Sequence, residues 1–273
     1  MGFTGRTVIA IAAVLIIYSQ GAGAEKIKAG GSGGMIPLIS ELGKAYMAKN
    51  PNDTIEVLKE SYDAKGGIMG VYAGKLDIGL SARFLEPDEQ SLNLTATEIA
   101  RVATVIGVNS ESVKIKSLTK NQICSIYAGT IKNWKDIGGH DAKIVALTRP
   151  DADSTKKAVR KGLQCFSSLK EDAQVQKMQT SKDMIHGLTN APNSIGLTDM
   201  VAVDDSMGKV AALNIEGITP STDNIISGKW PIIKNFVIVT KGHPSGLVKR
   251  FIDFIKSTEG ASIIKNSKAI AVN

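Results

Sequence analysis

Near its N-terminus the sequence reads Lys26-Ile27-Lys28-Ala29-Gly30-Gly31-Ser32-Gly33-Gly34 and continues as Met35-Ile36-Pro37-Leu38-Ile39-Ser40-Glu41-Leu42. Residues 26–29 have β character, residues 30–34 are rich in glycine, and the apolar side chains that follow recur at helical spacing. The segment therefore predicts a strand, a tight turn and the start of a helix. Glycine lets main-chain N–H groups approach a ligand closely, and a helix N-terminus presents unpaired donors with a partial positive charge. We expect an anion-binding turn here.

Residues 1–24 predict a cleaved secretory signal peptide. They carry Arg6, an apolar stretch over residues 8–17, and the small-residue site Ala22-Gly23-Ala24 before Glu25. The apolar stretch is too short to span a bilayer, which favours a cleaved signal over the alternative of an uncleaved anchor. No cysteine lies near the cleavage point, so lipid attachment is not expected. The mature chain is predicted to be soluble and periplasmic, or outside the cell.

The charge and length of the mature chain narrow the classes of function. Residues 1–24 hold one basic and no acidic residue, so the totals of 33 basic and 26 acidic residues become 32 and 26, a net charge of +6. The basic residues are scattered without an aromatic-flanked block, so nucleic-acid binding is not expected. A mild positive charge suits an anionic solute. The remaining 249 of 273 residues can form two compact lobes.

The positions of the cysteines and histidines predict neither a metal centre nor a catalytic site. Cys124 and Cys165 can pair in an oxidising compartment or remain free. No Cys-x-x-Cys spacing or histidine cluster suggests a metal or cofactor. His140, His186 and His243 are far apart in sequence and no Gly-x-Ser-x-Gly motif is present, so we do not expect an enzyme.

Alternating helical and strand patterns along the chain predict an α/β fold. One expected helix ends at Tyr127 and can be capped by Ser117 or Thr119. We predict that residues 25–108 plus 201–273 form one lobe and residues 109–200 the other, so that the chain crosses twice beside a ligand cleft. Further helices are expected over residues 35–49, 66–73, 154–163, 245–256 and 259–265, and strands over residues 54–58, 76–80, 99–108, 143–147, 194–197 and 235–240.

Three separated segments resemble the substrate-binding proteins of phosphate-type ABC importers. Asp77-Ile78-Gly79-Leu80-Ser81-Ala82-Arg83-Phe84-Leu85 is similar to the family's Asp-Ile-Gly-x-Ser-Ser-Arg-Pro-Leu segment. Gly129-Thr130-Ile131-Lys132-Asn133-Trp134 is similar to its Gly-x-Ile-x-Asn-Trp signature, and Ser257-Thr258-Glu259-Gly260 to its C-terminal Ser-Pro-Glu-Gly pattern. The resemblance runs in order from about residue 28 to the end of the chain.

The resemblance implies a type II periplasmic binding-protein fold. Each lobe would be a mixed, mostly parallel sheet flanked by helices, with phosphate or a similar small oxyanion held in the cleft and delivered to the permease subunits of an ABC importer. A monomer without a cofactor is expected. The alternative is a secreted sensor or interaction protein of the same fold that binds a different small anion, or none.

The resemblance also implies that ligand donors come from four short segments. Several hydroxyl donors of the family are missing here: glycines replace the first-turn threonines, Ala64 replaces a serine, and Asp153 replaces another serine. Ala82 stands where some phosphate binders have a carboxylate. The candidate ligand-binding residues are Ser32, Gly33, Gly34, Lys65, Gly66, Ser81, Arg83, Arg149, Asp153, Ser154 and Thr155.

Arg149 is the strongest candidate, because a guanidinium can make two parallel charge-assisted bonds to an oxyanion. It can instead form an ion pair with Asp151 or Asp153. Asp153 can cap the helix that follows it, or it can face the cleft, where it would favour hydrogen phosphate over sulfate.

Two further cations have alternative roles. Lys65 can replace the missing hydroxyls or lie solvated at the surface. Arg83 can bind the anion or stabilise its own loop by pairing with Glu86 or Asp88.

Overall fold

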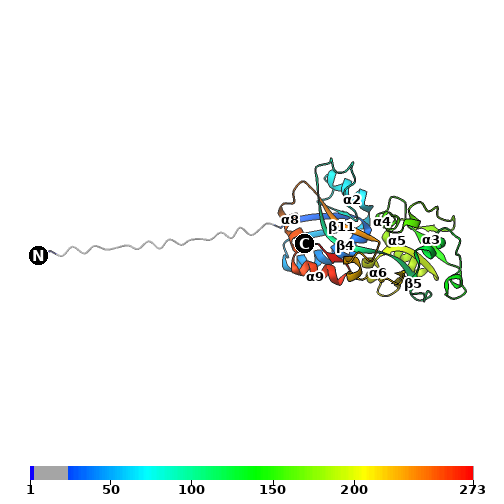
Figure 1. Ribbon diagram of the computed structural model, residues 1–273. Coiled ribbons are helices and arrows are strands. Elements are labelled where there is room, and N and C mark those ends of the chain that lie inside the picture. Colours follow the sequence, from blue (N-terminus) through cyan, green and yellow to red (C-terminus); the bar gives the residue numbers. More distant parts are fainter. Residues whose placement is uncertain (3–23, 273) are drawn as a thin grey trace.

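The computed structural model describes residues 1–2 and 24–272. The predicted signal peptide falls mainly on residues 3–23 and so lies outside the described residues. Within the described part of the chain, no helix combines the length and apolar character needed to cross a membrane. Figure 1 shows two lobes side by side, with α2, α8 and α9 in one and α3, α4 and α5 in the other.

Helices and strands alternate along the chain, as predicted. The helices are α1 (Ile36–Lys49), α2 (Asp63–Tyr72), α3 (Lys120–Tyr127), α4 (Ser154–Gly162), α5 (Ser181–Asn190), α6 (Met200–Asp205), α7 (Thr222–Ile226), α8 (Gly246–Ile255) and α9 (Thr258–Asn266), with the 3-10 turns η1 (Gly33–Met35), η2 (Trp134–Ile137) and η3 (Gln164–Phe166). The strands are β1 (Lys26–Gly31), β2 (Thr54–Ser61), β3 (Ile78–Ser81), β4 (Leu94–Asn109), β5 (Ser117–Leu118), β6 (Val145–Thr148), β7 (Gln176–Lys177), β8 (Ser194–Asp199), β9 (Val210–Ala212), β10 (Asn214–Ile215), β11 (Ile233–Lys241) and β12 (Ile270–Ala271).

The main sheet runs through both lobes in the order β2-β1-β3-β11-β4-β8-β6-β7. Strand β1 pairs in parallel with β2 and β3, and β6 pairs in parallel with β7 and β8. Each antiparallel pair in the described sheets contains β4 or β11, the two long strands at the centre of Figure 1. The predicted mixed α/β fold is confirmed.

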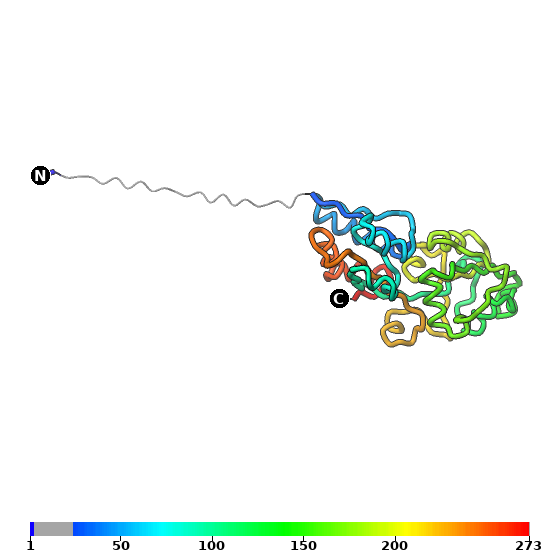
Figure 2. The backbone as a smooth tube through the Cα atoms, turned by 90° about the horizontal axis from the view of Figure 1, so that it is seen from above, coloured from blue at the N-terminus to red at the C-terminus, as the bar shows by residue number. Residues whose placement is uncertain are grey.

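Each lobe has its own apolar core. The first core packs α1, α8 and α9 against β1, β3 and β11, and the second surrounds the buried indoles of Trp134 and Trp230. Figure 2 shows the same division from above, because the N- and C-terminal segments share one lobe and the middle of the chain forms the other.

The chain crosses between the cores at places that differ from the predicted boundaries. Along β4, Val102 belongs to the first core and Ala103 to the second; on the return, Ile232 belongs to the second and Phe236 to the first. The predicted second boundary at residue 201 is therefore about thirty residues early. Apolar side chains between these points bury in the second lobe, and the Trp230 indole donates to the carbonyl oxygen of Thr104 at 3.1 Å.

Side-chain caps mark the starts of several helices, although α1, α2 and α8 have none. Thr119 caps α3, because its hydroxyl accepts from Gln122 N at 3.1 Å while the Gln122 side chain accepts from Thr119 N at 2.8 Å. Ser117, the alternative cap, lies in β5 instead. Helix α2 begins at Asp63, three residues before the predicted start, so Lys65 and Gly66 belong to its first turn.

In the structure Cys124 of α3 and Cys165 of η3 form a disulfide that closes a sequence separation of 41 residues. We expect the double variant Cys124→Ala/Cys165→Ala to lower the free energy of unfolding by about 2–4 kcal/mol, because the cross-link restricts the unfolded chain. Urea denaturation of both proteins measures this difference, with the reduced parent as the matched control. Equal denaturation midpoints for all three samples would contradict the expectation.

Candidate anion-binding site

The glycine-rich turn of the first lobe is built by close backbone contacts. Gly31 ends β1 with a φ of +141°, and a Cβ there would overlap the carbonyl oxygen of Leu80 and lie 2.9 Å from Gly67 Cα. The turn η1 follows, and the N–H groups of Gly33 and Gly34 stand in its first positions, where no intrahelical acceptor exists. The predicted N–H donors are therefore in place.

Serines beside this turn are partly used by the protein itself. Ser32 Oγ accepts from Ala82 N at 3.2 Å, which leaves the Ser32 hydroxyl proton free to donate. The Ser81 hydroxyl donates to the carbonyl oxygen of Arg83 at 2.7 Å. Ser81 therefore stabilises its own loop, and its proton is not available to an anion.

In the second lobe, the segment between β6 and α4 carries the predicted guanidinium and hydroxyl. Asp153 caps α4, because its Oδ1 accepts from Thr155 N at 2.9 Å and from Lys156 N at 3.2 Å. Its Oδ2 accepts from Arg149 Nη2 at 2.7 Å. Asp153 therefore fills the capping role and the ion-pair role together.

Arg149 is only 4% exposed, yet much of its guanidinium lacks a partner. Nη2 binds Asp153, whereas Nε and Nη1 are buried without a hydrogen-bond partner among the described residues. A buried donor left unpaired costs free energy, and the cost is higher when the group is charged. The segment is therefore incomplete without an additional acceptor.

The carboxylate of Asp153 stays ionised in this setting. Burial alone would raise the pKa of Asp153, but the hydrogen bond from Arg149 and the positive charges of Arg149 and Lys234 lower this pKa below its usual value. An ionised carboxylate only accepts hydrogen bonds. Asp153 can therefore contact a ligand only through a proton that the ligand carries.

Two site residues, Lys234 and Asp199, were not selected from the sequence. Lys234 lies on β11 with 4% exposure, and its Nζ donates to Asp199 Oδ2 at 2.7 Å and to Thr155 Oγ1 at 3.1 Å. A Cβ on Gly34 would lie 3.0 Å from Asp199 Oδ2 and 3.3 Å from Lys234 Nζ. The first-lobe turn and the start of α4 therefore meet at this ion pair. The signal that could have identified Lys234 in the sequence is a single lysine within an apolar strand pattern.

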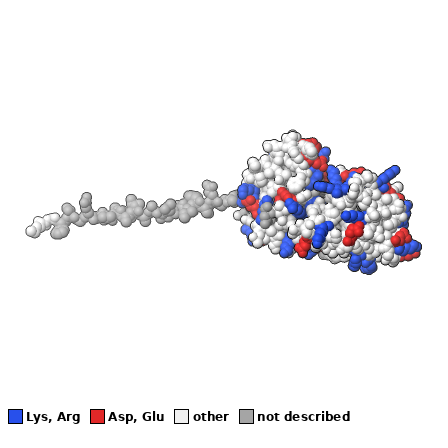
Figure 3. Space-filling view, in the orientation of Figure 1, with Lys and Arg blue, Asp and Glu red and all other residues white. Residues whose placement is uncertain are grey.

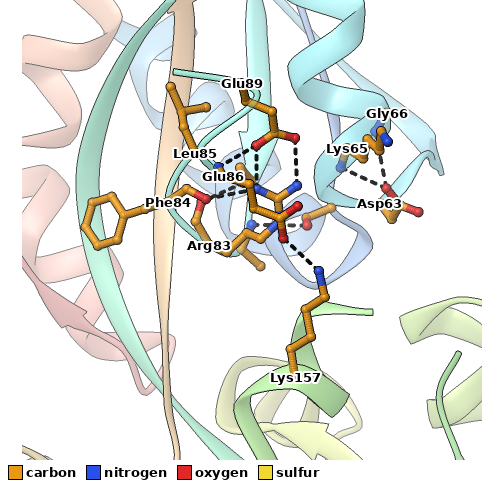
Figure 4. Close-up of polar contacts among 12 residues, drawn as sticks. Asp63, Lys65, Gly66, Arg83, Phe84, Leu85, Glu86, Glu89 and Lys157 are labelled. Carbon is orange, nitrogen blue, oxygen red and sulfur yellow. Dashed lines mark hydrogen bonds and ion pairs between the residues drawn. The ribbon is translucent and has the colours of Figure 1, made fainter. Parts of the chain in front are cut away.

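Arg83 is engaged by its own loop (Figure 4). Its Nη1 and Nη2 donate to the two carboxylate oxygens of Glu89 at 2.6 and 2.8 Å, and its Nε lies 3.5 Å from Glu86 Oε1. Of the two predicted pairing partners, Glu86 lies close to Arg83. The second carboxylate that pairs with Arg83 is the buried Glu89 and not Asp88. These N–H groups hold the loop and are not free for an anion. Glu86 also reaches Lys157 of α4 at 2.7 Å, which links the lobes.

Lys65 and Gly66 lie at the start of α2, where a carboxylate of the chain occupies the helix N-terminus (Figure 4). Asp63 Oδ1 accepts from Lys65 N at 2.9 Å and from Gly66 N at 3.2 Å, and Gly66 N also donates to Tyr62 O at 3.1 Å. The predicted Gly66 donor is therefore already satisfied. Lys65 is exposed, in agreement with its solvated alternative.

A pocket of about 510 Å³ opens beside the glycine turn. It is lined by Gly33, Gly34 and Ser61 of the first lobe and by the start of α5 in the second, including Ser181. Arg149 and Thr155 are not among the described residues that line it. The pocket is therefore an opening next to the buried donors rather than the cavity that holds them.

The surface carries mixed charge. Figure 3 shows Lys and Arg interspersed with Asp and Glu on this face, without a continuous basic stripe. Among the residues that the structure describes, no group of His, Cys, Asp and Glu could hold a metal ion. The buried Arg149 donors that lack a partner among the described residues are thus the distinctive polar feature.

Two α/β lobes, joined by crossing strands and meeting at buried donors, define a two-lobed solute-binding protein. The family comparison agrees: a profile described as the PBP superfamily domain matches residues 18–259. The chain belongs to this family. The membership confirms the predicted class of substrate-binding protein.

Relatives of this chain are described as phosphate-binding proteins. The phosphate-binding protein PstS of Bacillus subtilis strain 168 is 32% identical over 235 residues, covering 84% of this chain and 74% of that protein. PstS of Borreliella burgdorferi is 28% identical over 257 residues, covering 90% of each. A phosphate ABC-transporter substrate-binding protein from Clostridium perfringens, solved with bound phosphate, superposes with a TM-score of 0.80 at 28% identity, covering 91% of this chain and all of that one.

Proposed function

We propose that this protein captures phosphate between its lobes and delivers it to the permease subunits of an ABC importer. The observation that carries the proposal is Arg149, a buried guanidinium whose Nε and Nη1 have no hydrogen-bond partner among residues 24–272. A guanidinium N–H group without a partner can donate a charge-assisted hydrogen bond to an oxygen of a tetrahedral anion. The relatives that are named phosphate-binding proteins support the same ligand.

Further donors come from the glycine turn of the first lobe and from the start of α4. The N–H groups of Gly33 and Gly34 face no intrahelical acceptor, Ser154 begins α4, and the Thr155 hydroxyl is buried next to Arg149's segment. A desolvated oxyanion needs this many donors, because each unpaired oxygen would lose its hydrogen bonds to water. The ligand set that we propose therefore differs from the predicted one by losing Lys65, Gly66, Ser81 and Arg83 as direct contacts.

Carboxylates in the site favour a ligand that carries a proton. Asp153 uses three of about four acceptor positions on its two oxygens, which leaves room for one donor. Phosphate at neutral pH keeps a proton on one or two oxygens, whereas sulfate has none. We therefore expect phosphate to be preferred over sulfate.

Contacts between the lobes support a closure that encloses the ligand. Lys157 of α4 reaches Glu86 of the first lobe at 2.7 Å, and both side chains are about two-fifths exposed. Exposed pairs of this kind contribute little free energy, so the anion itself would supply most of the closing energy. We also propose that the protein acts as a monomer outside the cytoplasm after removal of residues 1–24, and that it has no nucleic-acid partner.

Isothermal titration tests this function. Protein lacking residues 1–24 is refolded to remove bound ligand and titrated with phosphate, sulfate, molybdate and a phosphate monoester. We expect saturable heat with phosphate, accompanied by a raised melting temperature, because a ligand that binds only the folded state stabilises it. Sulfate should bind more weakly. No heat and no melting shift with any of the four anions would rule out the proposal.

A further inference from the structure

The glycine turn of the first lobe lacks the threonine hydroxyls that the resemblance leads one to expect. Gly33 and Gly34 have no side chain to donate from. A Cβ on Gly34 would lie 3.3 Å from the Nζ of Lys234 and 3.0 Å from Asp199 Oδ2, closer than most Cβ contacts. Glycine at position 34 therefore allows an ammonium to stand against the turn where a side chain would crowd it.

The position of Lys234 is determined by the strand that carries it. Lys234 and Phe236 are two residues apart on β11 and both are buried, as expected for side chains on one face of a strand. The Nζ lies 5.6 Å from the centroid of the Phe236 ring and 2.7 Å from Asp199 Oδ2. A buried ammonium is thus neutralised by one carboxylate and held from two sides.

The hydrogen bonds of Lys234 fix the direction of a second donor. An ammonium only donates, so Thr155 Oγ1 must accept the 3.1 Å bond from Nζ. The proton of the Thr155 hydroxyl is then free, and it has no acceptor among residues 24–272. Two of the three N–H bonds of Nζ point to Asp199 and Thr155, which leaves the third for another acceptor.

The charges around the site balance without a ligand. Arg149 is paired with Asp153 at 2.7 Å, and Lys234 with Asp199 at 2.7 Å. The charge of Lys234 also helps to keep Asp153 ionised, so the two pairs act on each other. Asp199 is further fixed because its Oδ1 accepts from Ala202 N at 2.9 Å and caps α6.

We propose that Lys234 is a ligand-binding residue, whose ammonium replaces the hydroxyl donors absent from the glycine turn and also orients the Thr155 hydroxyl toward the anion. Asp199 is a positioning residue that holds this ammonium. The inference rests on the proposed binding of phosphate. It assigns to a residue of β11, where the chain crosses between the cores, a direct role in recognising the ligand.

The test compares phosphate affinity in four proteins by titration calorimetry, with the melting temperature of each ligand-free sample recorded in parallel. The variants are Lys234→Met, Asp199→Asn, and the two combined. We expect Lys234→Met to weaken phosphate binding at least ~10-fold, the size of one charge-assisted hydrogen bond. Asp199→Asn can keep the α6 cap through its amide oxygen but no longer holds the ammonium, so we expect it to weaken phosphate binding less than Lys234→Met does.

The combined variant separates binding from charge compensation. The combined variant lacks both the Lys234 ammonium and the Asp199 carboxylate. Its melting temperature should therefore be higher than that of Lys234→Met, whereas its phosphate affinity should remain weak. Lys156→Met is the matched control, because the Lys156 ammonium is equally buried but is paired with Glu171 and Asp151. This control should lose stability and keep its affinity within ~3-fold, as expected for a residue outside the binding set.

The outcomes distinguish the two proposals. Parent-like affinity in the combined variant, or in Lys234→Met, would overturn the role of Lys234 while leaving phosphate binding intact. A parent protein that binds no phosphate would overturn the proposed function together with this inference. If Lys234→Met does not fold, the combined variant and Asp199→Asn still decide between the alternatives, because neither leaves a buried carboxylate unpaired.

Discussion

Arg149→Met weakens phosphate binding roughly 100-fold or more. The substitution keeps an apolar side chain of similar length but removes the Nε and Nη1 donors that are buried without partners. A hydrogen bond to a charged group contributes about 1.5–3 kcal/mol, and the loss of one at the upper end of this range corresponds to a loss of roughly 100-fold in affinity. Isothermal titration with phosphate measures the change.

The control for Arg149→Met removes the effect of its ion-pair partner. Asp153 loses the 2.7 Å bond from Nη2 in the single variant, which by itself can disturb the start of α4. In Arg149→Met/Asp153→Asn the amide oxygen can still cap the helix and no buried charge is left unpaired. We expect binding to remain weak in this double variant. Recovery to within a few-fold of the parent would show that Arg149 serves only to neutralise Asp153.

Gly31→Ala lowers the free energy of unfolding by about 3–5 kcal/mol, the sum of backbone strain and overpacking. Gly31 has a φ of +141°, and a methyl group there would overlap Leu80 O and lie 2.9 Å from Gly67 Cα. The three nearest atoms that it would meet belong to the backbone, so no side-chain rotation can relieve these contacts. Urea denaturation measures the loss.

Gly74→Ala is the matched control for Gly31→Ala. Gly74 also has a positive φ, +68°, but a Cβ there would meet nothing within 4 Å. It should therefore cost only the strain of the left-handed backbone, about 1–2 kcal/mol. Equal losses for the two variants would show that close packing of α2 against the glycine turn does not determine stability here.

The general fold was predictable because its signals are local. Periodicity placed most helices and strands, and Thr119 was one of the two caps predicted for α3. The return crossing was placed early because it depends on tertiary burial. Residues 202–232 alternate like the rest of the chain, and only their packing around Trp230 assigns them to the second lobe.

The site was predictable where its donors lie within one continuous segment. Arg149 and Thr155 are six residues apart and were found together, whereas Lys234 and Asp199 come from β11 and β8. Their contact depends on how the crossing strands align, which no local pattern encodes. The Glu89 pair of Arg83 was missed for a similar reason, because both Glu86 and Asp88 were equally plausible neighbours in sequence.

A crystal structure of the protein with phosphate tests the central claim most directly. The account predicts one phosphate between the lobes, with an oxygen about 2.7–3.2 Å from Arg149 Nε or Nη1, which is the ordinary distance of a hydrogen bond. Lys234 Nζ and the Thr155 hydroxyl should complete the contacts. Phosphate seated instead in the pocket near Ser181, with both Arg149 nitrogens still unpaired, would contradict the account.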